Sequence, residues 1–216
     1  MHKLPPAHVA LYENGELQIR RYWSPPREVD AGLTHDDAVE QLRELSRSAV
    51  RMRLQSEVPL GAFLSGGVDS TIIVGLMQQL VDAPVQTFSV GFPVPEYDET
   101  RFAREAAEYH RTQHRKFLVD PDATGAVDQL VWHYDEPFAD SSAIPTWYVS
   151  QHTRQHVTVA LSGDGGDELF AGYPRYRAVW LAAQCDRLPG PVARVLRWRL
   201  WQRLPSDARQ KSFARR

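Results

Sequence analysis

Short apolar segments alternate along the chain with longer segments in which apolar residues recur every three to four positions. Strands produce the first pattern and helices the second. The predicted strands of the main part of the chain are Leu60 to Leu64, Val85 to Val90, His114 to Val119 and Val157 to Leu161. The predicted helices are Thr34 to Arg53, a segment carrying Ile72 to Leu80, Arg101 to Tyr109, Ala123 to His133 and Thr146 to Thr153. This alternation predicts an α/β fold with a parallel sheet and helices on both faces.

The first 23 residues have a different pattern. His8 to Tyr12 and Leu17 to Trp23 flank Asn14-Gly15, and Asn-Gly between alternating apolar residues predicts a β-hairpin. An isolated hairpin is only marginally stable in water, so we expect it to need a partner surface. Residues 24–33, which include Pro25 and Pro26, have the composition of a linker, and residues 34–216 form the predicted main domain.

Composition limits the class of protein. The chain has 216 residues, 43% hydrophobic and 24% charged, with a net charge of −2, which is ordinary for a globular protein. The single cysteine, Cys185, excludes an internal disulfide framework. No apolar run reaches the roughly 20 residues that span a bilayer, and the N-terminus lacks the apolar region of a signal peptide. We therefore expect a soluble, cytoplasmic protein with no membrane partner.

The strand ending at Leu64 leads into the turn Ser65-Gly66-Gly67-Val68-Asp69-Ser70. A strand, a glycine turn and a helix point backbone N–H groups and a helix N-terminus at a phosphate. Ser65 and Ser70 add hydroxyl donors, and Asp69 is a candidate magnesium ligand. The turn is neither a Walker A loop, since no Gly-Lys-Ser/Thr occurs, nor a dinucleotide-binding turn, because its glycines are adjacent. By itself it fits a tight strand–helix connection equally well.

A second glycine cluster, Ser162-Gly163-Asp164-Gly165-Gly166-Asp167-Glu168, follows the last predicted strand. Its glycines would admit a nucleotide's sugar and phosphates close to the backbone, and Asp164, Asp167 or Glu168 would bind magnesium. The spacing does not match an EF-hand loop. Both clusters lie at carboxyl ends of predicted parallel strands, where such sheets bind ligands. We therefore expect one magnesium ion shared between Asp69 and Asp167.

Further polar residues lie between the predicted helices that end at His133 and begin at Thr146. Asp135, Glu136, Asp140 and Ser141 are candidates for a wall that contacts a polar substrate. A solvated turn around Pro137 is the alternative.

Three other residues could be mistaken for sites. His110 and His114 have the spacing of a zinc pair on a helix, but they straddle a predicted helix–strand junction, and no H-E-x-x-H is present. We interpret them as surface or packing histidines, and Cys185 as a small buried residue. The basic C-terminal end, from Arg194 to Arg216, is interpreted as a solvated helix, with an RNA-binding tail as the alternative.

On these motifs the chain resembles asparagine synthetases of the glutamine-hydrolysing type. Ser65 to Ser70 matches the pyrophosphate loop of the ATP-pyrophosphatase superfamily, which also contains tRNA-modifying and GMP-forming enzymes. Ser162 to Tyr173 is more specific to the asparagine synthetase group, and the remaining matches are Phe88 to Phe92 and Asp135-Glu136-Pro137. The resemblance implies a fold like that of the adenine nucleotide alpha-hydrolases, preceded by a short hairpin.

The resemblance implies an ATP-dependent ligase. The side-chain carboxylate of aspartate would attack the α-phosphate of ATP, giving β-aspartyl-AMP and pyrophosphate, and ammonia would then displace AMP to give asparagine. Asp69 and Asp167 would bind magnesium, and no catalytic side chain is assigned. The ATP-binding residues that the resemblance implies are Leu64, Ser65, Gly66, Gly67, Asp69, Ser70, Val90, Ser162, Gly163 and Asp164.

Two features depart from the family pattern. The family has a catalytic cysteine after the initiator methionine, where this chain has His2, and only the hairpin resembles the end of the glutaminase half. The family's synthetase domain, including a lysine that assists adenylation, continues beyond the point matching Arg216. We therefore expect an internal fragment that uses a separate ammonia source or glutaminase domain.

Three alternatives stay open at this point. The chain could be a non-catalytic nucleotide-binding remnant, a relative that acts on another carboxylate as β-lactam synthetases do, or a tRNA-modifying enzyme. The net charge of −2 gives no general attraction to nucleic acid, which argues against the last.

Overall fold

The computed structural model describes residues 3–26, 28–93, 98–119, 123–136, 138, 140 and 142–187. The chain divides into two compact units, Met1–Leu45 and Ser46–Arg216, and each is described by itself. Among the described residues, no helix combines the length and the apolar character that crossing a membrane requires.

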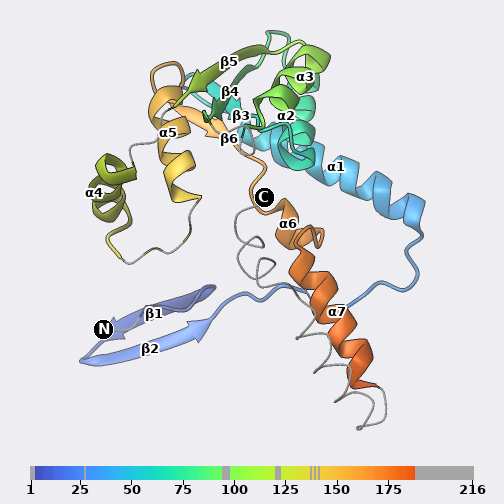
Figure 1. Ribbon diagram of the computed structural model, residues 1–216. Coiled ribbons are helices and arrows are strands. Elements are labelled where there is room, and N and C mark those ends of the chain that lie inside the picture. The colour runs from blue at the N-terminus through green and yellow to red at the C-terminus, as the bar shows by residue number, and fades with distance from the viewer. Residues whose placement is uncertain are drawn as a thin grey trace. The chain divides into compact units, whose positions relative to one another are not determined.

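The first unit contains the predicted hairpin. Strands β1 (His8–Glu13) and β2 (Glu16–Arg21) pair antiparallel, with Ala10 opposite Ile19 and Tyr12 opposite Leu17 (Figure 1). Gly15 has φ +85°, the left-handed conformation that the Asn-Gly turn needs. Tyr12 and Leu17 are 70% and 61% exposed. The hairpin thus forms as predicted and shows apolar side chains on its surface.

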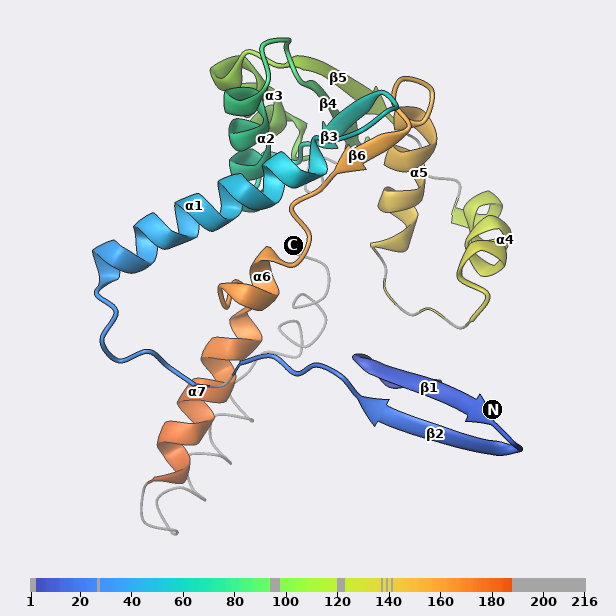
Figure 2. The same ribbon diagram turned by 180° about the vertical axis from the view of Figure 1, so that it is seen from behind.

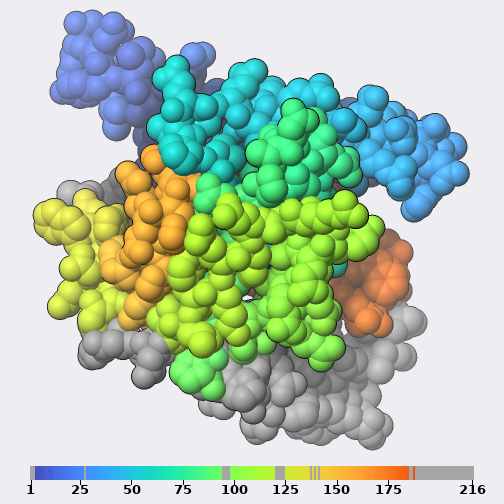
Figure 3. All heavy atoms as spheres, turned by 90° about the horizontal axis from the view of Figure 1, so that it is seen from above, coloured from blue at the N-terminus to red at the C-terminus, as the bar shows by residue number. Residues whose placement is uncertain are grey.

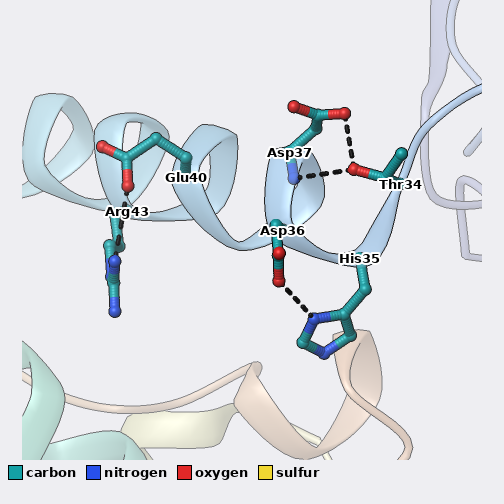
Figure 4. Close-up of polar contacts among 6 residues, drawn as sticks. All are labelled: Thr34, His35, Asp36, Asp37, Glu40 and Arg43. Carbon is teal, nitrogen blue, oxygen red and sulfur yellow. Dashed lines mark hydrogen bonds and ion pairs between the residues drawn. The ribbon is translucent and has the colours of Figure 1, made fainter.

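Helix α1 (His35–Arg53) begins in the first unit and ends in the second. Its start follows the prediction, since the backbone N–H of Asp37 donates to the Thr34 hydroxyl at 3.2 Å and the hydroxyl donates to the Asp37 carboxylate (Figure 4). Arg43 pairs with Glu40 one turn along, at 3.3 Å. The acidic first turn, Asp36 and Asp37, complements the helix dipole.

The second unit is built on a four-stranded sheet in the order β5-β4-β3-β6, with every adjacent pair parallel (Figures 1 and 2). The chain runs from β3 outward to β4 and β5, and β6 then lies on the other side of β3. The strands are β3 (Leu60–Phe63), β4 (Gln86–Gly91), β5 (Gln113–Leu118) and β6 (Val159–Leu161). The helices are α2 (Val68–Leu80), α3 (Thr100–His110), α4 (Ala123–Tyr134), α5 (Ala143–Thr153), α6 (Gly166–Leu169) and α7 (Pro174–Asp186).

Helices cover both faces of this sheet. On one face, α2 and α3 pack on β3 and β4, around a core in which Ala62, Val74 and Ala103 are completely buried. On the other face, Phe88 stacks on Phe117 and on His156, which follows α5. Successive residues of a strand point to opposite faces of the sheet, so a sheet with apolar residues on both faces needs helices on both. The observed fold class is therefore the predicted one.

The element bounds differ from the predicted ones at a few ends. Helix α5 begins at Ala143, three residues before the predicted Thr146, because Pro145 fits the first turn of a helix. Within the second glycine cluster, Gly166–Leu169 forms the short helix α6, which was not predicted. Beyond α7 the basic segment from Arg194 onward lies outside the described residues.

Candidate functional site

The turn after β3 is closed by its two serines. Leu64, 1% exposed, continues the sheet beyond β3, with its N–H donating to the Phe88 carbonyl at 2.8 Å. The Ser65 and Ser70 hydroxyls lie 3.0 Å apart, and the Gly67 N–H donates to the Ser65 hydroxyl at 3.2 Å. Ser70 in turn donates to the Gly67 carbonyl at 3.2 Å. The turn therefore has a defined shape before any ligand binds.

Helix α2 begins directly after this turn, without a side-chain cap. Gly67 occupies the N-cap position in an extended conformation, and because glycine has no side chain, no side-chain capping hydrogen bond forms. The first N–H groups of a helix have no partner within the helix. At α2 they are free of a competing cap, which is the arrangement that suits a phosphate.

Gly66 fits its place because it has no side chain. Its φ is +83°, and a Cβ there would overlap the backbone of Phe102 and Ala103 in the first turn of α3. The left-handed conformation alone favours glycine, and the contact excludes any larger residue. The turn thus rests directly on α3, a contact that the sequence did not predict.

The second glycine cluster follows β6 and meets the first. β6 pairs with β3, with Leu161 opposite Ala62. A Cβ on Gly163 would lie 2.7 Å from the Ser70 backbone nitrogen and 2.9 Å from the Asp69 carbonyl carbon. The predicted meeting of the two clusters is therefore visible as contact between Gly163 and the first turn of α2. This edge of the sheet is also where the strand order reverses, the position at which open α/β sheets bind ligands.

The carboxylates lie on these same segments. The Asp69 carboxylate packs against Gly166, where a Cβ would overlap its carboxyl carbon. Asp164 accepts a hydrogen bond from the Ser162 hydroxyl at 2.9 Å. The Asp167 carboxylate turns toward Gly172, where a Cβ would overlap one of its oxygens.

The described residues contain no group of three histidine, cysteine or carboxylate side chains that could hold a metal by themselves. Magnesium, however, keeps several waters and commonly takes only one or two carboxylates together with substrate phosphates. The Asp69 carboxylate lies against Gly166 and Asp167 lies in α6, and a magnesium-binding role for either one stays a prediction. Their pairing on one ion stays a prediction.

Glu168 is held by Tyr173, a residue for which no role was predicted. The Tyr173 hydroxyl donates to the Glu168 carboxylate at 2.6 Å, and this hydrogen bond lowers the pKa of Glu168. Glu168 therefore stays ionised at neutral pH. The sequence offered one signal for this contact: Tyr173 follows Glu168 by five residues, and the end of α6 and the bend after it bring the two side chains together.

The remaining predicted residues lie elsewhere on the sheet and its helices. Val90 is half-buried in β4, opposite Phe117 of β5. Asp135 follows the end of α4, with φ +52° and its N–H donating to the Val131 carbonyl.

Asp140 accepts a hydrogen bond from the Ser142 N–H at 2.9 Å, just before α5, and this bond lowers its pKa. Ser141 lies outside the described residues. Glu136 is described, but its place in a substrate wall stays a prediction, as does that of Asp135 and Asp140. Asp140 has at least one local role, because it holds the start of α5.

The two histidines are packing residues, as interpreted from the sequence. The half-buried His114 hydrogen-bonds to the Thr87 hydroxyl at 3.0 Å and to the Ser89 hydroxyl at 3.1 Å, and burial lowers its pKa. The ring of His110 lies on Gly75 of α2, at 2.7 Å from the position of a Cβ. The side chain of Cys185 lies outside the described residues.

Comparison with known proteins identifies the family to which the segment that carries these contacts belongs. Residues 41–216 match the family model described as asparagine synthase. The chain is 41% identical over 177 residues to a putative glutamine-hydrolysing asparagine synthetase 2 of Methanocaldococcus jannaschii, covering 79% of this chain and 34% of that protein. It is 32% identical over 193 residues to asparagine synthetase 1 of Bacillus subtilis, covering 89% of this chain and 30% of that protein.

The chain therefore spans about a third of the length of these relatives. Among solved structures, it is similar to an NH3-dependent NAD synthetase of Campylobacter jejuni, with a TM-score of 0.42 and 14% identity over 62% of this chain and 60% of that one.

Proposed function

The chain belongs to the asparagine synthase family, and from that premise we propose that it forms the ATP-cleaving part of an amide-forming ligase. One observation carries the proposal. Gly163 lies against the first turn of α2, so a phosphate-binding turn and an acidic glycine cluster share one edge of the sheet. A pyrophosphate bound there would meet N–H groups on one side and carboxylate-held magnesium on the other.

The proposed reaction begins with adenylation. A carboxylate oxygen of the substrate forms a bond to the α-phosphorus of ATP, and the bond from that phosphorus to the bridging oxygen breaks, releasing pyrophosphate. Ammonia then attacks the acyl carbon, AMP leaves, and the nitrogen loses a proton. We propose aspartate as the carboxylate, with asparagine as the product, since the relatives carry the name asparagine synthetase.

The chain's own part in this chemistry is to bind and orient. The hydroxyl and N–H groups of Ser65, Gly67 and Ser70 hydrogen-bond within the turn. On binding, they would exchange these bonds for bonds to the departing pyrophosphate. Asp69 and Asp167 would hold magnesium, which supplies neutralisation of the pyrophosphate charge. Orientation and charge stabilisation of this kind require no nucleophilic side chain from the protein.

The adenosine and the second substrate would lie next to the pyrophosphate. Leu64, Val90, Ser162, Gly163 and Asp164 surround the ends of β3, β4 and β6, and we propose that they contact the nucleotide. The segment from Asp135 to Asp140 is proposed to contact the carboxylate substrate. Ammonia would come from solution or from a glutaminase domain.

Pyrophosphate release tests the proposal. The full chain, supplied with ATP, magnesium, aspartate and ammonium, is expected to release pyrophosphate only when all of the first three are present. Replacement of aspartate by other carboxylates then tests the choice of substrate. No release, even with a glutaminase-containing partner supplied, would contradict the ligase assignment; ATP binding by calorimetry without turnover would instead establish a nucleotide-binding module.

A further inference from the structure

The first turn of α3 is a wall of the proposed site, although no part of α3 is assigned a ligand. Gly66 lies directly on the backbone of Phe102 and Ala103, with no side chain between them. A backbone-to-backbone contact cannot be relieved by a rotamer change. The position of the serine–glycine turn, residues 65–70, therefore depends on where α3 begins.

Asp98 fixes the beginning of α3. One of its carboxylate oxygens accepts hydrogen bonds from both the backbone N–H and the hydroxyl of Thr100, at 3.1 and 2.5 Å. Thr100 is buried, with 4% exposure, so these donors have little access to water. The same hydrogen bonds, with the nearby Lys116, lower the pKa of Asp98, which keeps it ionised.

The second oxygen of Asp98 ties this turn to the sheet. It lies 3.5 Å from the Lys116 ammonium of β5, and Asp98 is 29% exposed. α3 and β5 contact each other, and residues of this part of the chain form the lime-green surface in the middle of Figure 3. Gly91, the last residue of β4, leaves room for the arrangement, because a Cβ there would lie 2.8 Å from the Thr100 methyl group and 3.0 Å from the Asp98 oxygen.

These contacts form a continuous series from β5 to the phosphate-binding turn. Lys116 holds Asp98, Asp98 holds Thr100, and the turn that Thr100 begins supports Gly66. We propose that Asp98 is a positioning residue for the pyrophosphate loop, acting through the first turn of α3. The inference rests on the proposed function, because the loop matters only if it receives a pyrophosphate.

The consequence is specific to the phosphate end of the ligand. Loss of Asp98 would let the first turn of α3 fray, and Gly66 would lose its support while the sheet and its adenosine-facing ends remained in place. If Asp98 had a purely structural role, its loss would instead lower the affinity for every ligand equally, or for none. The affinities for pyrophosphate and for AMP, which lacks the pyrophosphate, separate these cases.

The experiment compares Asp98→Ala with the wild-type full chain by calorimetry with Mg-ATP, inorganic pyrophosphate and AMP. Asp98 precedes the N-cap residue Glu99 and accepts a hydrogen bond from the N–H of Thr100, as a capping side chain does. Loss of such a capping hydrogen bond is commonly worth about a fivefold change in a local equilibrium. We expect Asp98→Ala to weaken ATP and pyrophosphate about fivefold and AMP less than about twofold. Asp98→Asn keeps an oxygen for Thr100 but loses the ion pair with Lys116, so it should recover only part of the loss. Asp82→Ala, at an exposed aspartate after α2, is the matched control.

Hydrogen exchange of the segment from Leu64 to Ser70 gives a readout that needs no ligand. Asp98→Ala should speed its exchange about fivefold, while Asp82→Ala should not. Unchanged exchange, or equal weakening of AMP and pyrophosphate, would overturn the inference. If the wild-type chain binds neither ATP nor pyrophosphate, the proposed function fails and exchange alone decides the positioning role.

If Asp98→Ala does not fold, Asp98→Asn and Lys116→Met are compared singly and together. The pair should then show a combined effect smaller than the product of the two, because both changes remove the same ion pair. Independent effects would count against the coupling between β5 and the turn.

Discussion

Gly163→Ala tests the contact on which the proposed site depends. The added Cβ would lie 2.7 Å from the Ser70 nitrogen, 2.9 Å from the Asp69 carbonyl carbon and 3.0 Å from the Asp69 Cβ. Two of these atoms are backbone atoms at the start of α2, so no rotamer change can relieve the overlap. Gly163 is not among the residues with positive φ, and alanine is therefore compatible with its backbone conformation. The effect is steric alone.

The expected size follows from the overlap. Ordinary van der Waals contacts of a Cβ begin at about 3.4 Å, so the second glycine cluster must move away from α2 by several tenths of an ångström. Extra methyl groups in well-packed regions cost about 1–3 kcal/mol. If this cost appears in unfolding, Tm falls by roughly 2–12 °C for a unit of this size. If it appears in nucleotide binding, ATP affinity falls by about 5- to 150-fold.

Thermal unfolding with and without Mg-ATP separates these two outcomes. The control is Gly32→Ala, because a Cβ at Gly32 has its nearest atom, an Asp30 oxygen, at 3.4 Å. We expect the control to match the wild type in Tm and in ATP affinity. If Gly163→Ala also matches the wild type in both, then the two glycine segments do not touch, and the site as described is wrong.

Three further changes have expected outcomes. Gly66→Ala combines a φ of +83° with backbone overlap, so it should lower Tm and ATP affinity more than Gly163→Ala in the same assays. Burial lowers the pKa of His114 from 6.5, so below that pH the unfolded chain takes up a proton that the folded chain does not. The free energy of unfolding, measured with urea, should therefore fall as pH drops below about 6.5. His114→Asn should remove this contribution to the pH dependence. Tyr173→Phe should raise the pKa of Glu168 toward its ordinary value, as followed by carboxyl NMR titration, and an unchanged pKa would exclude the hydrogen bond.

The regular elements could be predicted because their signals are local. Asn14-Gly15 fixes the hairpin turn and Thr34 caps α1. The apolar run before Ser65 is a strand in the prediction and in the structure alike. The meeting of the two glycine clusters could also be predicted, since parallel strands carry their following loops to one edge. These inferences need only the period of the pattern and the rules for connecting strands.

The contacts that define the site could not be predicted in the same way. Gly66 against Ala103, and Gly163 against Ser70, depend on how closely segments far apart in the sequence approach. The position of a glycine in the sequence does not indicate which distant segment will pack against it. Asp98 carried a local signal, since it precedes Thr100 by two residues at a helix start, but its pairing with Lys116 depends on the register of β5.

The pairing of β3 with β6 has a consequence for how the protein comes to fold. Ala62 and Leu161 are neighbours in the sheet but about 100 residues apart in the chain, and so large a loop closes slowly. During synthesis the serine–glycine turn can therefore form well before the acidic cluster that completes the proposed nucleotide site. If ATP binds at this edge as proposed, it would bind only chains in which that last closure has occurred, and would thereby stabilise the finished fold over its partly folded precursors.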